Sequence, residues 1–162
     1  MKKLFLIRHA KSSWKFDVID HERPLTSRGL EDSVIIANTL KLQKINPDLV
    51  MVSDAVRTKK TAEIILNTLE IPNNRVVFNH NLYDFEGQLL TQTIKKCNAT
   101  INTLMVFCHN HALTSFVNTY GSLILDNVPT CGVVEIDFNI TDWKDLNTGV
   151  TLQTLFPKAL KK

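Results

Sequence analysis

Cysteine and glycine are scarce in this sequence, and their scarcity excludes several kinds of site. The 162 residues include three cysteines, Cys97, Cys108 and Cys131, and five glycines. An odd number of widely spaced cysteines argues against a disulfide framework and against a zinc site built on cysteine. No arginine stands six positions after any cysteine, so the Cys-x5-Arg loop of cysteine-dependent phosphatases is absent. No Gly-Lys-Ser/Thr run occurs either, which excludes a Walker-type nucleotide loop.

Long apolar runs and a strong net charge are missing as well. No stretch of about 18 apolar residues occurs, so we expect no membrane partner. The apolar segment after Met1-Lys2-Lys3 is too short for a signal-peptide core, and a cytoplasmic protein is expected. The net charge of +3 comes partly from terminal lysines and gives little reason to expect a nucleic-acid partner. With 44% hydrophobic residues, the composition predicts a single globular domain over residues 1–162.

Short apolar runs alternate with segments of helical periodicity along the chain. Buried strands are predicted at residues 4–7, 49–52, 76–78 and 104–108. Helices are predicted from a Thr26 or Ser27 cap to Leu42 and at about 57–69, 88–98 and 112–120. Residues 133–138 and 150–156 are predicted to form a closing strand pair. This alternation predicts an α/β fold, a three-layer α/β/α sandwich around a mostly parallel, doubly wound sheet.

Three predicted strands are each followed by basic side chains. Arg8 and His9 follow the first strand, Arg57 comes just after the second, and His109 follows the strand at 104–108. Open α/β sheets place ligands at the carboxyl ends of their strands, so these side chains are predicted to converge there. Arginine binds phosphate oxygens in pairs, and a histidine can attack phosphorus with one nitrogen while the backbone fixes the other. The set therefore predicts phosphoryl transfer to a histidine and then to water, with no metal required.

A metal site is the alternative that the histidines leave open. His109-x-His111 has the spacing of a chelate, and His9 could join it. Such a site lacks a clear carboxylate ligand, and Arg8 and Arg57 would repel the cation. We therefore predict no metal and no cofactor at this edge of the sheet.

Several segments together resemble a known family. They are Arg8-His9-Ala10-Lys11-Ser12-Ser13-Trp14, Arg23-Pro24-Leu25-Thr26-Ser27-Arg28-Gly29, the stretch 53–62 around Arg57, Leu82-Tyr83, Cys108-His109-Asn110, Pro129-Thr130-Cys131-Gly132 and Pro157-Lys158-Ala159-Leu160. In this order they are similar to the motifs of the histidine phosphatase (phosphoglycerate-mutase-like) superfamily, and more narrowly to its SixA-type phosphohistidine phosphatases. The resemblance covers nearly the whole chain. It implies a phosphoglycerate-mutase-like fold.

The resemblance also implies roles for individual residues. His9 would be the phosphorylated nucleophile, and Arg8, Arg57 and His109 would hold the phosphate, with Lys11 and Ser12 expected to assist. The chain departs from the family pattern at Ala10, often glycine there, and at Cys108, often a small residue. The superfamily's Glu or Asp proton donor has no clean match here. Asp84 and Glu86 lie in the corresponding region, and solvated loop carboxylates are the alternative for both.

The substrate implied by the resemblance is phosphohistidine on a partner protein or a small phosphorylated metabolite. A phosphate-binding module without turnover is the non-enzymatic alternative, and a monomer is expected. The chain is too short for a large helical lid, so we predict a shallow, open, cationic pocket with Lys11, Trp14 and Lys15 at its rim. A loop at 84–87 folded over the mouth is the competing possibility. Asp20 and Arg23 are expected to pair beside it, and His21 and His80 to lie at the surface.

Overall fold

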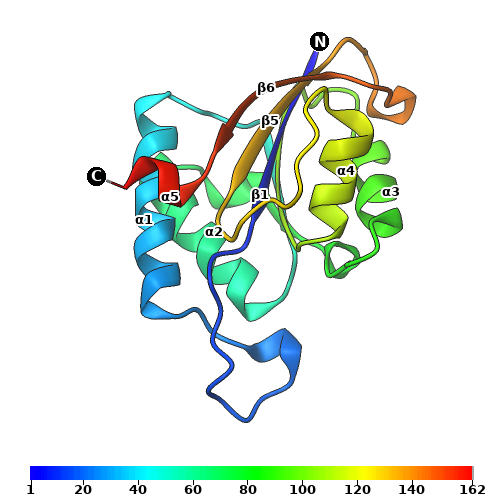
Figure 1. Cartoon of the computed structure of the whole chain (residues 1–162). Coiled ribbons are helices and arrows are strands. Elements are labelled where there is room, and N and C mark those ends of the chain that lie inside the picture. Colours follow the sequence, from blue (N-terminus) through cyan, green and yellow to red (C-terminus); the bar gives the residue numbers. More distant parts are fainter. Residues whose placement is uncertain (162) are drawn as a thin grey trace.

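The computed structural model describes residues 1–161, which form a six-stranded sheet with helices on both faces (Figure 1). The strands are β1 (Lys2–Arg8), β2 (Leu49–Val52), β3 (Val76–Phe78), β4 (Thr103–Cys108), β5 (Val133–Phe138) and β6 (Val150–Leu155). Their order in the sheet is β3-β2-β4-β1-β5-β6. The first four neighbours pair in parallel, whereas β5 pairs antiparallel with both β1 and β6. The predicted mostly parallel α/β sheet and its closing strand pair are confirmed.

The helices follow the predicted positions closely. They are α1 (Ser27–Leu42), α2 (Val56–Leu69), α3 (Gln88–Lys95), α4 (Ala112–Tyr120) and α5 (Pro157–Leu160), with short 3₁₀ turns η1 (Asp20–Glu22), η2 (Asn73–Arg75), η3 (His80–Leu82) and η4 (Trp143–Asp145). Helix α3 ends at Lys95, three residues before Asn98, where the sequence predicts its end. The side chain of Asn98 accepts a hydrogen bond from the Thr100 amide at 2.9 Å, so it builds a turn instead of continuing the helix.

Alternate side chains of β1 enter two separate apolar layers. Leu4 and Leu6 pack in the cluster that includes core residues of α3 and α4. Phe5 and Ile7 pack with core residues of α1 and α2 on the opposite face. All four side chains are fully buried, and each such burial stabilises the fold by roughly 1.5–3 kcal/mol. Because both faces of this central strand are covered, its apolar run is continuous and the three-layer arrangement follows.

Strand pairing brings three carboxyl ends together in the middle of the sheet. Arg8, the last residue of β1, is in register with Cys108 at the end of β4. On the other side of β4, Val52 at the end of β2 is in register with Phe107. The residues that follow these three strands therefore lie near one another, at the edge where doubly wound sheets bind ligands.

The start of α1 is fixed against the segment that follows β1. The Thr26 side chain caps the helix by accepting a hydrogen bond from the Gly29 amide at 3.0 Å, and the Thr26 amide donates to the Lys11 carbonyl at 2.9 Å. A Cβ at Gly29 would lie 2.3 Å from that carbonyl oxygen, so glycine is needed for this close approach. Within residues 1–161, no helix combines the length and the apolar character needed to cross a membrane.

Candidate active site

His9 is buried at the end of β1, and its two ring nitrogens have different partners. Nδ1 lies 2.7 Å from the Ala10 carbonyl oxygen, and because a carbonyl only accepts, this nitrogen carries the proton. Arg57 Nε donates to His9 Nε2 at 3.3 Å. The hydrogen bonds thus assign a tautomer in which Nε2 carries no proton and its electron pair accepts the hydrogen bond from Arg57. Burial, and then the neighbouring arginines, lower the pKa of His9 to about 3, so the ring stays neutral at pH 7.

Arg57, in the first turn of α2, is almost completely buried and is held by Asp20. Its Nη1 donates to the Asp20 backbone carbonyl at 2.7 Å, and its Nη2 donates to the Asp20 carboxylate at 3.0 Å. The Tyr83 hydroxyl donates to the same carboxylate oxygen as Nη2. Burial by itself raises the pKa of Asp20, but the hydrogen bonds from Tyr83 and Arg57 outweigh it and hold that pKa well below its usual range. Asp20 is therefore ionised and fixes the guanidinium beside His9.

His109 follows β4 and faces His9, with 5.2 Å between the ring centroids. Its Nε2 lies 2.7 Å from the Ser53 hydroxyl, and Arg57 Nη2 lies 3.5 Å from its Nδ1. Burial first, and then the charges of its neighbours, lower the pKa of His109 to about 2. Ser53 follows β2 directly, so all three neighbouring strand ends contribute to one cluster.

Arg8 has an unpaired donor beside this cluster. Its Nη1 donates to the Val128 carbonyl at 2.9 Å. Its Nε is buried and has no hydrogen-bond partner among residues 1–161. Burial and then the charge of Arg57 lower the pKa of Arg8. Such a donor needs an acceptor, and an oxyanion supplies one.

A hollow of about 320 Å³ opens over these side chains. Its lining comprises Arg8, His9, Lys11, Ser12, Trp14, Asp20, Arg23, Arg57, Phe85, Asn110, His111 and Thr130. Lys11 and Trp14 are exposed and line the hollow as predicted for its rim, whereas Lys15 is exposed but is not among the lining residues. The hollow thus collects the cationic set that the strand ends predicted, apart from His109, which lies fully buried behind it.

The predicted Asp20–Arg23 pair is present but is more than a surface ion pair. Arg23 is buried, donates from Nε to Asp20 at 3.0 Å and donates from Nη1 to the Ser12 hydroxyl at 2.8 Å. Its guanidinium carbon lies 3.5 Å from the centroid of a Trp14 ring, a cation–π contact. Arg23 therefore holds Ser12 and Asp20 in place through hydrogen bonds, and the Trp14 ring covers the Arg23 guanidinium group.

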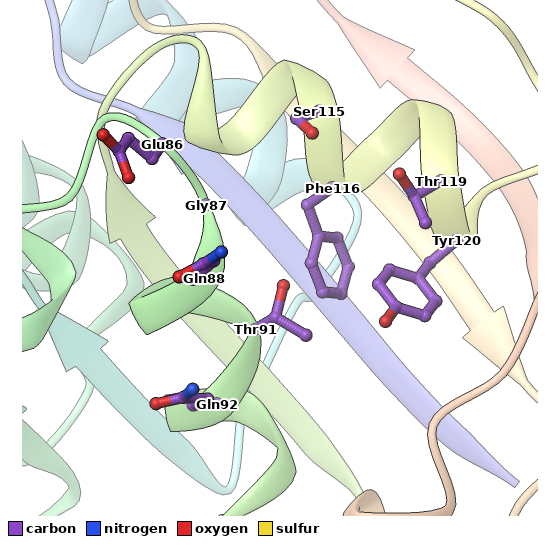
Figure 2. A pocket seen from close by; sticks show the side chains of 9 residues that line it. All are labelled: Glu86, Gly87, Gln88, Thr91, Gln92, Ser115, Phe116, Thr119 and Tyr120. Carbon is purple, nitrogen blue, oxygen red and sulfur yellow. The ribbon is translucent and has the colours of Figure 1, made fainter.

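Neither of the two carboxylates considered as proton donors is among the residues that line this hollow, although Phe85 between them is. Asp84 is buried, and its side chain accepts hydrogen bonds from the amides of Gly87 and Leu90, both at 3.0 Å, so it caps the start of α3. Glu86 is exposed and lines a different hollow of about 340 Å³ between α3 and α4, with Gln88 and Ser115 (Figure 2). The geometry favours neither as a proton donor to a phosphate beside His9.

His111 and Phe85 complete the mouth of the hollow. His111 is exposed and adopts φ 63° and ψ −59° immediately before α4, and the Ala112 amide donates across it to the Asn110 carbonyl at 2.8 Å. This is a γ-turn, a strained form that is rare outside functional sites. Within residues 1–161, His9, His109 and His111 do not gather ligand atoms closely enough to share one ion.

Some contacts at the site were not predicted from the sequence. The sequence predicts a pair of Asp20 with Arg23 only, and it predicts no role for Ser53. From the sequence, Tyr83 is only part of a motif. In the structure its hydroxyl binds Asp20, and its ring lies edge-on to the His109 ring, with 5.2 Å between the ring centroids. The useful pattern was the position of Ser53 directly after a buried strand, the same criterion that identified His9 and His109.

Comparisons with known proteins agree with this geometry. The family model of the histidine phosphatase superfamily (branch 1) matches residues 4–89, just over half of the chain. An uncharacterized chloroplastic protein of Arabidopsis thaliana is 41% identical over 61 residues, and the phosphohistidine phosphatase SixA of Escherichia coli is 33% identical over 75 residues. These alignments span 37% and 46% of this chain and 28% and 46% of the two relatives, less than half of either.

The fold has a close match among solved structures. A structure of the protein histidine phosphatase SixA complexed with tungstate superposes with a TM-score of 0.80, over 98% of this chain and 99% of that one, at 22% identity. At that identity the likeness establishes the fold, which is the phosphoglycerate-mutase-like arrangement expected from the motifs. Together with the matched motifs around Arg8, His9 and Arg57, these findings place the chain in the histidine phosphatase superfamily, and its fold is similar to that of SixA.

Proposed function

We propose that this chain is a metal-independent phosphohydrolase that dephosphorylates phosphohistidine on a partner protein through a phosphorylated His9. The observation that carries the proposal is the state of His9. Its ring is neutral, its Nδ1 is tied to the Ala10 carbonyl, and its Nε2 faces the hollow beside Arg57. A nucleophile needs this combination, because a protonated or differently tautomerised imidazole has no electron pair to offer at Nε2.

The reaction then has two balanced displacement steps. His9 Nε2 attacks phosphorus, the bond from phosphorus to the substrate imidazole nitrogen breaks, and that nitrogen takes up a proton. Water next attacks the phosphorus on His9, the bond between phosphorus and His9 Nε2 breaks, and inorganic phosphate leaves. The charge on the equatorial oxygens is stabilised by Arg8 and Arg57, and the Arg8 Nε has no partner within residues 1–161. His109 would join them once its proton lies on Nδ1, because its Nε2 is turned to Ser53. Tungstate, bound in the SixA structure, is a tetrahedral oxyanion of the same shape class as phosphate.

The absence of a carboxylic acid from the hollow bears on the substrate. The lining residues include one carboxylate, Asp20, which is ionised and bound to Arg57 and Tyr83. An imidazole leaving group departs more easily than an alkoxide, above all when solvent has already protonated it. A site with no dedicated acid therefore suits a phosphoramidate better than a sugar phosphate. This supports phosphohistidine over a small phosphate ester.

The proposal is tested by turnover with EDTA present. Purified protein is offered a histidine-phosphorylated protein, p-nitrophenyl phosphate and several sugar phosphates, and phosphate release is measured. We expect the phosphohistidine protein to be turned over with the highest kcat/KM, and His9→Ala and His9→Gln to lose at least about 10³-fold in kcat. Circular dichroism of both variants checks that the fold is kept.

Four other results would each contradict a part of the proposed function. Turnover that survives in both His9 variants would remove His9 as the nucleophile. Activity that EDTA abolishes and zinc restores would overturn metal independence. Preference for a sugar phosphate over every phosphohistidine protein would move the chain to the small-metabolite class, and binding without phosphate release would make it a phosphate-binding module.

A further inference from the structure

His21, Asp54 and His80 form a second polar cluster beside the site. The three residues come from separate segments, namely η1, the link between β2 and α2, and the start of η3. His21 Nε2 lies 2.8 Å from Asp54 Oδ1, and His80 Nδ1 lies 2.9 Å from Asp54 Oδ2. Sequence analysis placed both histidines at the surface and gave them no partner, yet both rings turn toward the same carboxylate.

The spacing of the cluster fits the first coordination shell of a transition metal. The three candidate ligand atoms all lie within 4.8 Å of one another, and within residues 1–161 this group alone meets that condition. Two ligands bound about 2.0–2.2 Å from one ion, at tetrahedral or octahedral angles, stand roughly 3–3.5 Å apart. The two N···O separations therefore need only small shifts to accept an ion.

The protonation chemistry of the cluster also permits metal binding. A neutral imidazole can move its proton to the other ring nitrogen, so the nitrogen that now donates to Asp54 can become a ligand. Within residues 1–161, the side chains of His21 and His80 make no other hydrogen bond that this change would break. The carboxylate carries the negative charge that two neutral imidazoles lack. The cluster thus offers the two-histidine, one-carboxylate set found in many zinc and iron sites.

The three side chains are all partly exposed, to different degrees, so the cluster is open to solvent. His21 and Asp54 are about one-third exposed, with side-chain values of 28% and 32%, and His80 is 71% exposed. A metal can reach the cluster from solvent, and at least one coordination position is left for water or an anion. Two imidazole ligands select ions of the zinc, nickel, copper and iron(II) group over magnesium or calcium.

We propose that His21, Asp54 and His80 bind a divalent transition metal of the zinc class at the edge of the phosphate pocket. This site takes no part in the proposed chemistry at His9, which needs no metal. Its two inner ligands are direct neighbours of pocket residues. His21 follows Asp20, which holds Arg57, and Asp54 follows Ser53, which binds His109. A bound ion would therefore tie together the segments that hold the phosphate-binding side chains.

Metal binding is measured directly, so the test does not depend on the proposed phosphatase activity. Protein stripped with a chelator and dialysed is titrated with zinc by calorimetry and with cobalt(II) by visible absorption. We expect one equivalent of zinc to bind and cobalt to develop the ligand-field bands of a site with nitrogen and oxygen ligands. His80→Ala and Asp54→Asn are each expected to weaken zinc binding at least about tenfold, because each removes one of three protein ligands. The exposed position of His80 makes its replacement safe for folding.

The control variant is His111→Ala, which removes an exposed histidine that lies outside the cluster. We expect it to bind zinc as the unsubstituted chain does. Zinc is also expected to raise the thermal midpoint of the unsubstituted chain and of His111→Ala, but not of His80→Ala. Binding lost in His111→Ala or His9→Ala and kept in His80→Ala would place the ion in the phosphate pocket and overturn the proposal. Absence of any zinc binding would overturn it as well.

Discussion

His9 and His109 are two buried imidazoles packed beside buried guanidinium groups. His9 is 6% exposed and His109 is fully buried, and no carboxylate of residues 1–161 makes a direct hydrogen bond to either ring. Burial disfavours the charged form of a histidine, and nearby cations disfavour it further. Both rings are therefore kept in the form that can accept a phosphoryl group or a hydrogen bond, and this has a consequence for stability.

The folded-state pKa of about 3 for His9 predicts a loss of stability in acid. The unfolded chain takes up a proton on this histidine near its ordinary pKa of 6.5, whereas the folded protein does not until about 3. The unfolded state binds more protons between these values, so stability falls as pH falls through that window, by at most about 1.4 kcal/mol per pH unit for this group. We expect His9→Gln to remove this part of the slope in urea unfolding series between pH 6.5 and pH 4.5.

Other groups titrate in the same range, so the difference between the two proteins is the quantity to compare. Nuclear magnetic resonance of the His9 ring gives an independent check. Its carbon-bound proton should not titrate between pH 5 and pH 8. A transition near 6.5 for that proton, or parallel pH slopes for the two proteins, would show that the buried ring takes up a proton readily.

At the scale of elements, the site depends on how α1 and the loop before it are joined. The segment after β1 folds back over the hollow, and the start of α1 holds it through the Lys11 carbonyl. The Arg23-Pro24-Leu25-Thr26-Ser27-Arg28-Gly29 motif thus has a local physical basis. Thr26 caps the helix, Arg23 binds Ser12, and Gly29 leaves room for the Lys11 backbone. Loss of this contact would displace the pocket lining without touching His9.

Gly29→Ala is expected to destabilise the protein and to weaken substrate binding. The new Cβ would stand 2.3 Å from the Lys11 carbonyl oxygen. Because the Cβ is fixed to the backbone of α1 and the oxygen belongs to the backbone of the Lys11 segment, one segment must shift. Overpacking of this kind costs about 1–3 kcal/mol. The free energy of unfolding in urea and the KM for the phosphohistidine substrate measure the two effects.

Asn38→Ala, at an exposed position of the same helix, is the matched control. Its stability should stay within about 0.5 kcal/mol of the unsubstituted protein. If Gly29→Ala proves as stable and as active as this control, the close contact between α1 and the Lys11 segment does not support the pocket.

At the scale of the whole molecule, the hollow is bordered by exposed side chains, and no helix within residues 1–161 closes over it. Trp14 is 75% exposed and Phe85 is 42% exposed, and they line the same opening. Phe85 belongs to the loop that could have closed the mouth. Its ring packs against the His109 ring, with 5.1 Å between the ring centroids, and narrows one side of the hollow, yet it remains partly exposed. A phosphorylated side chain carried on another protein therefore has room to approach.

Salt should act on association more than on turnover. The hollow is lined by Lys11 and Arg8 on a chain of net charge +3, so an acidic phosphoprotein is attracted over a distance that salt screens. Between low and high salt, we expect KM for such a substrate to rise by roughly a factor of 3 to 10 and kcat to change by less than about twofold. Initial rates over a range of sodium chloride concentrations measure both.

The small ester p-nitrophenyl phosphate, which carries a phosphate charge but no acidic protein surface, serves as the comparison substrate. Its KM should respond less to salt. Equal responses of both substrates would mean that attraction acts on the phosphate alone, and that no acidic partner surface is recognised.

The sequence by itself determined the strands, most of the helices and the placement of the reactive side chains. Short continuous apolar runs such as Leu4–Ile7, in alternation with helical segments, favour strands covered on both faces, and the residues after such strands meet at one edge of a parallel sheet. Arg8, His9, Arg57 and His109 were therefore predictable as one cluster, because the rule depends on local patterns and on topology. The Pro157–Leu160 helix was recognised only as part of a motif.

Tertiary structure alone decided how the loops meet that cluster. Asp20 is 37 residues from Arg57 and Tyr83 is 63 residues from Asp20, and no sequence periodicity links them. The same holds for His21, Asp54 and His80, and for Asp84, which resembled a proton donor by position but is bound to the amides of α3. Strands and helices repeat their backbone geometry and so leave a pattern in the sequence. A loop has no repeat, and the direction of its side chains is set by whatever it packs against.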